Sequence, residues 1–128
     1  MSTGPNILLV DDEERFRQNL QKMLRAHGLA VTAAGSGEQA LAALAAQPYD
    51  VILLDMRMPG LSGLETLAAL KANYPQTEVI VLTGHASVDT AAEIIRLGAF
   101  ELLLKPCPVE EILAKIESAY ERLLARRG

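Results

Sequence analysis

The sequence predicts an α/β domain, a doubly wound parallel sheet of five strands with helices on both faces. Short segments that are almost entirely apolar alternate with longer segments whose apolar residues recur at helical spacing. Continuous apolar strands are typical of parallel sheets, because both faces of such a sheet are buried. The alternation leaves no spare linker, so we expect five strand–helix units in a single domain spanning residues 1–128.

Each expected strand is a short run of Leu, Ile, Val or Ala followed by a polar or turn-forming residue. The five strands are predicted at residues 7–10, 31–34, 51–54, 79–82 and 102–104. After the first strand, apolar positions recur at helical spacing and Gly28 ends the helix. The stripe that this first helix is expected to bury consists of Phe16, Leu20, Met23, Leu24 and His27.

The second helix is expected to begin at Ser36, with Gln39 placed to complete a capping box, and to stop at Pro48. Its expected buried stripe is Ala40, Leu41 and Leu44. The third helix is expected to bury Leu64, Leu67, Ala68 and Leu70 and to stop before Pro75.

The fourth helix is expected to open at Ser87 and to end at Gly98. Its predicted buried stripe is Val88, Ala91, Ile94 and Ile95. The fifth helix begins near Pro108, which suits a first helical turn. Its expected stripe is Val109, Ile112, Leu113, Ile116, Tyr120, Leu123 and Leu124. An ordered core of about residues 6–125 is predicted, with 126–128 as the start of a linker.

Composition and charge exclude several classes of protein. The net charge is −4 and no basic block forms a footprint for nucleic acid. The single cysteine, Cys107, excludes an internal disulfide and fits a reducing compartment. No apolar stretch approaches the roughly 18 residues of a membrane span, and residues 1–6 lack the features of a signal peptide. We expect a cytoplasmic protein that binds neither membranes nor, through this domain, nucleic acid.

Polar residues follow four of the predicted strands. Asp11 and Asp12 follow the first, Asp55 the third, Thr83 the fourth and Lys105 the fifth. Ligand sites of open α/β sheets lie at the carboxyl ends of the strands, so we expect these side chains to converge. Taken singly, each has a plainer interpretation: an acidic helix start, a turn residue before Gly84, or a lysine that extends its ammonium to solvent.

Together these residues suit phosphoryl transfer to a carboxylate. Crowded carboxylates repel unless a cation joins them, and Mg²⁺ prefers oxygen ligands. Zinc is not expected, because the cluster lacks His and Cys. Asp55 would act as the nucleophile, while Mg²⁺ on Asp11 and Asp12 and the ammonium of Lys105 neutralise phosphoryl oxygens. We expect Lys105 to pair with Asp55 and the Thr83 hydroxyl to bond the phosphoryl group.

Over nearly its whole length the chain resembles the receiver domains of two-component response regulators. The segments that carry the resemblance are Leu9–Glu13, Leu54–Gly63, Leu82–Gly84, Gly98–Ala99 and Leu104–Pro106. The resemblance implies the flavodoxin-like strand order 2-1-3-4-5 and a cis Lys105–Pro106 bond. It implies a signalling switch rather than an enzyme, one that catalyses only its own aspartyl phosphorylation and dephosphorylation.

The resemblance also assigns roles to the converging residues. Asp55 matches the phosphoacceptor and a metal ligand, Asp11 and Asp12 match the acidic metal-binding pair, and the backbone carbonyl of Arg57 matches a further Mg²⁺ ligand. Thr83 matches the switch hydroxyl and Lys105 the phosphate-pairing lysine. The implied partner is a sensor histidine kinase or a histidine phosphotransfer protein. The phosphoryl group would switch the surface of the fourth helix, fifth strand and fifth helix, through which a phosphorylation-dependent homodimer is a further hypothesis.

The sequence departs from the family pattern at three places. Leu102 occupies the position of the usual switch aromatic, which puts the coupling route in doubt. Cys107 replaces a large apolar residue, and we interpret it as a packed residue rather than a redox-sensitive thiol. Arg57 and His85 flank the site, and our hypothesis is that Arg57 slows hydrolysis of the phosphoaspartate.

Four other functions are less consistent with the sequence. Phosphatases of the haloacid-dehalogenase type also form aspartyl phosphates, but their two aspartates are separated by one residue, whereas Asp11 and Asp12 are adjacent. A flavin module would want a Ser/Thr/Gly-rich phosphate loop after the first strand, and dinucleotide binding would want a G-x-G-x-x-G motif. A degenerate receiver used only for binding would lack some of the five converging residues, all of which are present.

Overall fold

The computed structural model describes residues 4–57 and 62–127, in which five strands alternate with five helices. The elements are β1 (Asn6–Val10), α1 (Glu14–Ala26), β2 (Ala30–Ala34), α2 (Gly37–Ala46), β3 (Val51–Leu54), α3 (Gly63–Asn73), β4 (Glu78–Thr83), α4 (Val88–Arg96), β5 (Glu101–Leu104) and α5 (Val109–Arg127).

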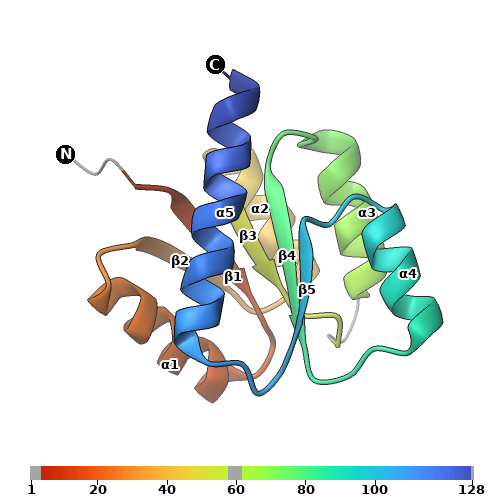
Figure 1. Cartoon of the computed structure of the whole chain (residues 1–128), viewed down its shortest axis with the longest axis horizontal. Coiled ribbons are helices and arrows are strands. Elements are labelled where there is room, and N and C mark those ends of the chain that lie inside the picture. Colours follow the sequence, from red (N-terminus) through yellow and green to blue (C-terminus); the bar gives the residue numbers. More distant parts are fainter. Residues whose placement is uncertain (1–3, 58–61, 128) are drawn as a thin grey trace.

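The five strands form one parallel sheet in the order β2-β1-β3-β4-β5, which confirms the predicted fold class (Figure 1). The register pairs Val10 with Leu54 and Thr83 with Leu104, so the carboxyl ends of these strands lie along one edge of the sheet. The start of β1 and the end of α5 lie at the opposite end of the molecule (Figure 1).

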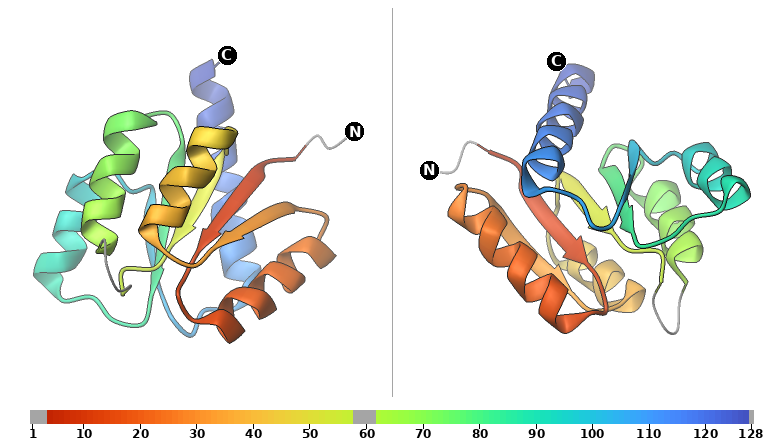
Figure 2. Two further views of the ribbon diagram at one scale, coloured as in Figure 1. Left: turned by 180° about the vertical axis from the view of Figure 1, so that it is seen from behind. Right: turned by 60° about the horizontal axis from the view of Figure 1, so that its bottom comes forward.

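Helices cover both faces of the sheet, and each face has its own hydrophobic core. Helices α1 and α5 pack on one face, whereas α2, α3 and α4 pack on the other (Figure 2). Alternate residues of each central strand enter opposite cores: Leu8 faces α2 and α3, and Leu9 faces α1 and α5. The complete burial of β3 and β4 explains why their sequences are continuous apolar runs.

The cap of α2 begins at the predicted residue, but the predicted capping box does not form. The Ser36 side chain accepts a hydrogen bond from the Gln39 amide, as expected, but the Gln39 side chain accepts one from the Gly35 amide and not from that of Ser36. The expected capping box is therefore absent there. A complete box forms instead at α3, between Ser62 and Glu65.

Several residues expected to be buried are exposed. Val88 and Ile95 of α4 are 86% and 51% exposed, and only Ile94 of that helix is fully buried. The apolar stripe of α4 is wider than the surface that β5, an edge strand, offers it, so two of its residues face solvent. Met23, His27 and Ala68 are also exposed on their helices, as are Leu104 at the end of β5 and Leu124 near the end of α5.

A buried charge that was not predicted fastens α5 to the start of β4. Glu78 is 1% exposed, and its carboxylate accepts a hydrogen bond from Arg126 at 2.7 Å and lies 3.4 Å from Arg122. Arg126 also donates to the Gln76 carbonyl. The residues expected to begin a linker thus remain helical and paired up to Arg127, whose guanidinium lies 3.7 Å from Asp50.

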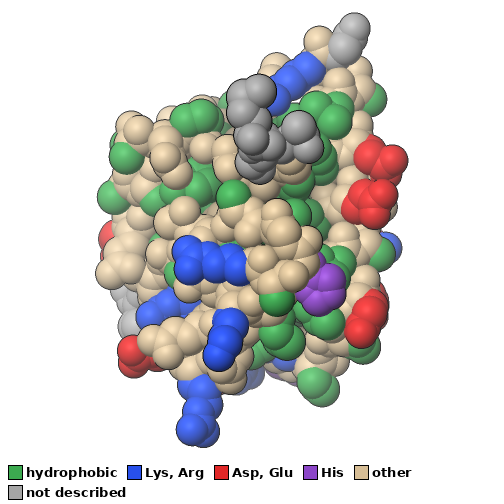
Figure 3. Space-filling view, turned by 90° about the vertical axis from the view of Figure 1, so that its left-hand side faces the viewer, with side chains coloured by type: hydrophobic (Ala, Val, Ile, Leu, Met, Phe, Trp, Pro, Cys, Tyr) green, Lys and Arg blue, Asp and Glu red, His purple; other side chains and the backbone are tan. Residues whose placement is uncertain are grey.

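The surface on the side of α1 and β2 carries separated Lys and Arg side chains with hydrophobic and uncharged surface between them, and no continuous basic band (Figure 3). None of the helices within residues 4–57 and 62–127 combines the length and hydrophobicity that a membrane span requires.

Candidate functional site

The converging side chains lie where the register of the sheet places them. Asp11 follows β1 and Asp55 follows β3, and these strands are neighbours. Backbone bonds extend past the strand ends, because the Asp55 amide donates to the Val10 carbonyl and the Lys105 amide to the Thr83 carbonyl. Hydrogen bonds between neighbouring strands therefore fix the backbone of these site residues.

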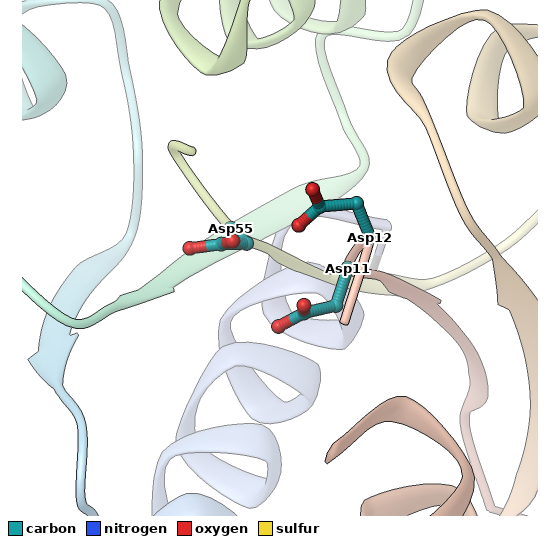
Figure 4. A group of neighbouring side chains, drawn as sticks. All are labelled: Asp11, Asp12 and Asp55. Atoms are coloured by element: carbon teal, nitrogen blue, oxygen red, sulfur yellow. The ribbon is translucent and has the colours of Figure 1, made fainter. Parts of the chain in front are cut away.

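The three aspartates form one acidic cluster. Carboxylate oxygens of Asp11, Asp12 and Asp55 lie within 4.8 Å of one another, and their side chains gather on one side of the strand ends (Figure 4). Asp11 and Asp55 are 1% and 4% exposed, whereas Asp12 is exposed. Two like charges are thus held close together with little solvent around them.

Local hydrogen bonds fix Asp11 at the turn between β1 and α1. Its carboxylate accepts a hydrogen bond from the Glu13 amide at 2.9 Å. Its backbone carbonyl accepts one from the Arg17 guanidinium at 2.8 Å. These bonds hold the carboxylate at the site even though the adjacent carboxylates repel it.

The pKa of Asp55 is raised above its ordinary value. Burial is the main cause, and the negative charge of Asp11 adds to it. The positive charge of Lys105, the nearby Thr83 hydroxyl and the Arg57 amide act in the opposite direction but do not cancel the rise. The cluster therefore favours any cation that removes the repulsion.

Lys105 extends its ammonium into the cluster, but its nearest partner differs from the expected one. Nζ lies 2.7 Å from an Asp11 oxygen, 3.2 Å from Glu13 and 3.9 Å from Asp55. The expected pair with Asp55 is present, but Asp11 is closer. Burial lowers the pKa of Lys105, and the hydrogen bond and charge of Asp11 outweigh that effect, so the pKa is raised. The Lys105–Pro106 peptide bond is cis, as the resemblance implied.

Thr83 supplies a buried hydroxyl at the end of β4. Its Oγ1 is fully buried and has no hydrogen-bond partner of good geometry among the described residues. It nevertheless lies close enough to Asp55 to lower the pKa of that carboxyl. Because an unsatisfied buried hydroxyl is costly, its position favours a ligand that would accept its hydrogen bond.

The cluster opens to solvent through a cleft of about 350 Å³. Its lining consists of Asp12, Glu13, Asp55, Arg57, Gly84 and Lys105. Arg57 and His85 are exposed, while Leu102 is partly buried against the core that contains α4. A further hollow of about 300 Å³ lies between α5 and the turn that joins α1 to β2; it contains none of the converging residues, and its mainly apolar lining offers no comparable chemistry.

Two residues of the site were missed from the sequence. Glu13 contacts Lys105, and the ring centroid of Phe16 lies 4.0 Å from the Lys105 ammonium. Phe16 had been assigned to the core of the first helix only, and it does pack there as well. Glu13 could have been predicted from the sequence, because it directly follows the aspartate pair.

The donor set fits a hard divalent cation. Carboxylate oxygens, two of them on buried residues, are the ligands that Mg²⁺ prefers, and no histidine or cysteine belongs to the group. Three carboxylates bring more negative charge than one lysine neutralises, which leaves room for a cation and then for an anion beside it.

A 2-1-3-4-5 parallel sheet with carboxylates, an ammonium and a hydroxyl at its carboxyl edge defines the class: an open α/β domain suited to an anionic ligand bound beside a cation. Comparison with known proteins identifies the family. Residues 7–117 match the response regulator receiver domain family. The chain therefore belongs to the receiver domains of two-component response regulators, which are signalling switches.

Individual relatives agree with this assignment. The DNA-binding transcriptional regulator NtrC of Salmonella typhimurium is 39% identical over 113 residues, which cover 88% of this chain and 24% of the relative. A receiver domain from Clostridium thermocellum has 36% identity and a TM-score of 0.86, covering 91% of this chain and 94% of that one. A CheY-like receiver from Methanospirillum hungatei has 25% identity and a TM-score of 0.92, covering 98% and 100%. The chain spans about a quarter of the length of NtrC.

Proposed function

We propose that this receiver domain takes a phosphoryl group on Asp55. The observation that carries the proposal is the convergence at Asp55: a buried carboxylate with two aspartates beside it, an ammonium 3.9 Å away and an unsatisfied hydroxyl aimed at it. In the family the phosphoacceptor role is standard, and Asp55 is the residue at the strand end that all the other groups face.

The reaction is a transfer between two nucleophiles. A carboxylate oxygen of Asp55 forms a bond to phosphorus while the bond from phosphorus to the donor's histidine nitrogen breaks. The nitrogen leaves with the electron pair, and the product is an acyl phosphate. Lys105 places its positive charge beside the phosphoryl oxygens, and Thr83 donates its hydroxyl proton in a hydrogen bond to one of them.

Asp11, Asp12, Asp55 and the backbone carbonyl of Arg57 would hold Mg²⁺. The cation supplies positive charge that neutralises the phosphoryl oxygens and the acidic cluster. With Asp11 engaged in this way, Lys105 would be free to pair with the incoming anion. The chain would thereby catalyse its own phosphorylation, and water that reaches the acyl phosphate would hydrolyse it to the Asp55 carboxylate and inorganic phosphate.

The phosphoryl group would act on the surface formed by α4, β5 and α5. Thr83 ends β4, next to Leu104 of β5 in the register, so a movement of Thr83 reaches β5 directly. Leu102 takes the place of the usual switch aromatic and would change rotamer in the partly buried position beside α4. Val88, Ile95 and Leu104 are exposed apolar residues of this surface, which supports a homodimer that depends on phosphorylation.

The partners follow from the family. The donor is a sensor histidine kinase or a histidine phosphotransfer protein in the cytoplasm. DNA binding is named for the relative NtrC, of which this chain covers 24%, and we assign none to residues 1–128 themselves. We propose that residues 1–128 form a single receiver domain, whose folded part extends to Arg127 at the end of α5.

Intact mass after incubation with acetyl phosphate tests the proposal. Wild-type protein with Mg²⁺ is expected to gain one phosphoryl group, and the gain is expected to vanish with EDTA or in Asp55→Asn. An adduct that persists in Asp55→Asn would assign the nucleophile to another residue. Folded wild-type protein that gains nothing under any condition would point to a degenerate binding module.

A further inference from the structure

The aromatic ring of Phe16 lies against the ammonium of Lys105. The distance from Nζ to the ring centroid is 4.0 Å, well inside the roughly 6 Å over which a cation above a ring is attracted. Phe16 belongs to α1 and packs against the hydrophobic core under α1 and α5, so neighbouring side chains hold the ring in place. Lys105 therefore has an uncharged partner in addition to its carboxylates.

The ring differs from the other three contacts of this ammonium. Asp11 and Asp55 belong to the acidic cluster, and a bound cation would withdraw their charge from Lys105. Glu13 has a side chain that is 66% exposed, so solvent screens its attraction. Of the four contacts, the ring alone is both held by packing and unaffected by charge neutralisation in the cluster.

The chemistry of phosphoryl transfer makes this difference useful. A lysine side chain has four rotatable bonds, and its ammonium is placed only by what it contacts. A carboxylate partner would repel the incoming phosphoryl group, whereas an aromatic ring attracts the ammonium without adding a negative charge beside the anion.

We infer that Phe16 is the positioning residue for Lys105, holding the ammonium beside the Asp55 carboxylate while phosphorus is transferred. The role in transfer rests on the proposed function above, whereas the contact itself does not.

The contact is tested first without any phosphodonor. In the NMR spectrum of the metal-free protein, the ring current is expected to shift the ε-methylene protons of Lys105 upfield. The shift is expected to disappear in Phe16→Leu and to remain in Phe16→Tyr. An unchanged Lys105 signal in Phe16→Leu would overturn the inference, whatever the outcome for Asp55.

Phosphorylation rates then test the role. At saturating Mg²⁺ and with acetyl phosphate, Phe16→Leu is expected to react about three- to tenfold more slowly than wild type, and Phe16→Tyr within about twofold of it. Affinity for Mg²⁺ is expected to be the same in all three proteins, because none of the proposed metal ligands is changed.

A matched control and a double-variant cycle separate positioning from packing. Phe100 is the other phenylalanine of the chain; it packs against the same core but lies near Arg122, 5.7 Å away, so Phe100→Leu is expected to leave the rate unchanged. In a Lys105→Ala background, Phe16→Leu is expected to cause no further slowing, since the ring acts through the ammonium. Equal slowing with and without Lys105 would show that Phe16 merely supports the fold.

Discussion

Replacing Asp55 with asparagine is expected to stabilise the protein in the absence of metal. The carboxylate of Asp55 is 4% exposed and lies within 4.8 Å of those of Asp11 and Asp12. At an effective dielectric constant of about 20, repulsion between the buried carboxylates of Asp55 and Asp11 at that separation is roughly 3–4 kcal/mol, whereas solvent screens the charge of the exposed Asp12. Attraction to Lys105 at 3.9 Å has about the same size, so these two charges nearly cancel and the cost of burying the Asp55 carboxylate remains.

The direction of the net effect follows from burial. The raised pKa of Asp55 shows that its surroundings, Lys105 included, disfavour the charged form. A neutral amide of the same shape removes that penalty, and we expect Asp55→Asn to raise the unfolding free energy by about 1–2 kcal/mol, a small remainder of larger opposing effects.

The dependence on pH has a defined sign. Because the folded protein raises the pKa of Asp55 above its ordinary value of 3.8, the folded state takes up a proton where the unfolded state remains ionised. The penalty on wild type is therefore present above the raised pKa and is lost as the pH falls toward 3.8. The advantage of Asp55→Asn is expected to shrink over the same interval.

Magnesium is expected to reverse the comparison. Wild type gains about 2.7 kcal/mol when Mg²⁺ is present at a hundred times its dissociation constant, whereas the variant has lost one of three carboxylates and gains less. Urea denaturation with EDTA and with Mg²⁺ measures both effects, with the exposed Glu121→Gln as a control for loss of one negative charge. If metal-free Asp55→Asn were no more stable than wild type, the assigned repulsion and burial cost would be refuted.

Three further variants test other parts of the structure. Glu78→Gln is expected to lower the unfolding free energy by about 1–3 kcal/mol and to speed hydrogen exchange in the last turns of α5, because it removes the buried carboxylate that holds Arg126; urea denaturation and exchange measure this. Gly63→Ala is expected to cost about 2–4 kcal/mol, measured in the same denaturation, because its Cβ would lie 2.4 Å from the Met56 Cα. Arg57→Ala is expected to shorten the phosphoaspartate lifetime several-fold, measured by loss of the mass adduct, if the exposed guanidinium shields the acyl phosphate from water.

For each of these variants, one outcome would contradict the prediction. Gly84→Ala places its Cβ in open space and is expected to be nearly neutral, so equal losses at the two glycines would refute the steric argument at α3. Unchanged exchange in α5 of Glu78→Gln would show that apolar packing alone holds the helix. An unchanged lifetime in Arg57→Ala would end the shielding hypothesis.

The sequence predicted the fold and five of the residues that meet at the site, but not Glu13 or Phe16. Continuous apolar runs such as 51–54 are typical of strands that are buried on both faces of a sheet. Parallel strands bring their carboxyl ends to one edge of the sheet. The polar residues that follow the runs, among them Asp55 and Thr83, are thereby predicted to lie together. The cis bond at Pro106 came from the family resemblance and is confirmed.

Tertiary structure decided which of these groups touch and which helix faces are covered. Lys105 prefers Asp11 over Asp55 and meets Phe16, and Glu78 is buried by an arginine 48 residues later, contacts that depend on side-chain reach across elements. Helical spacing marked Val88 and Ile95 as apolar, but it cannot tell how much of that stripe an edge strand will cover. Local patterns fix the backbone of this protein because they act within one element, whereas ion pairs and exposed apolar surface arise only when the elements are packed together.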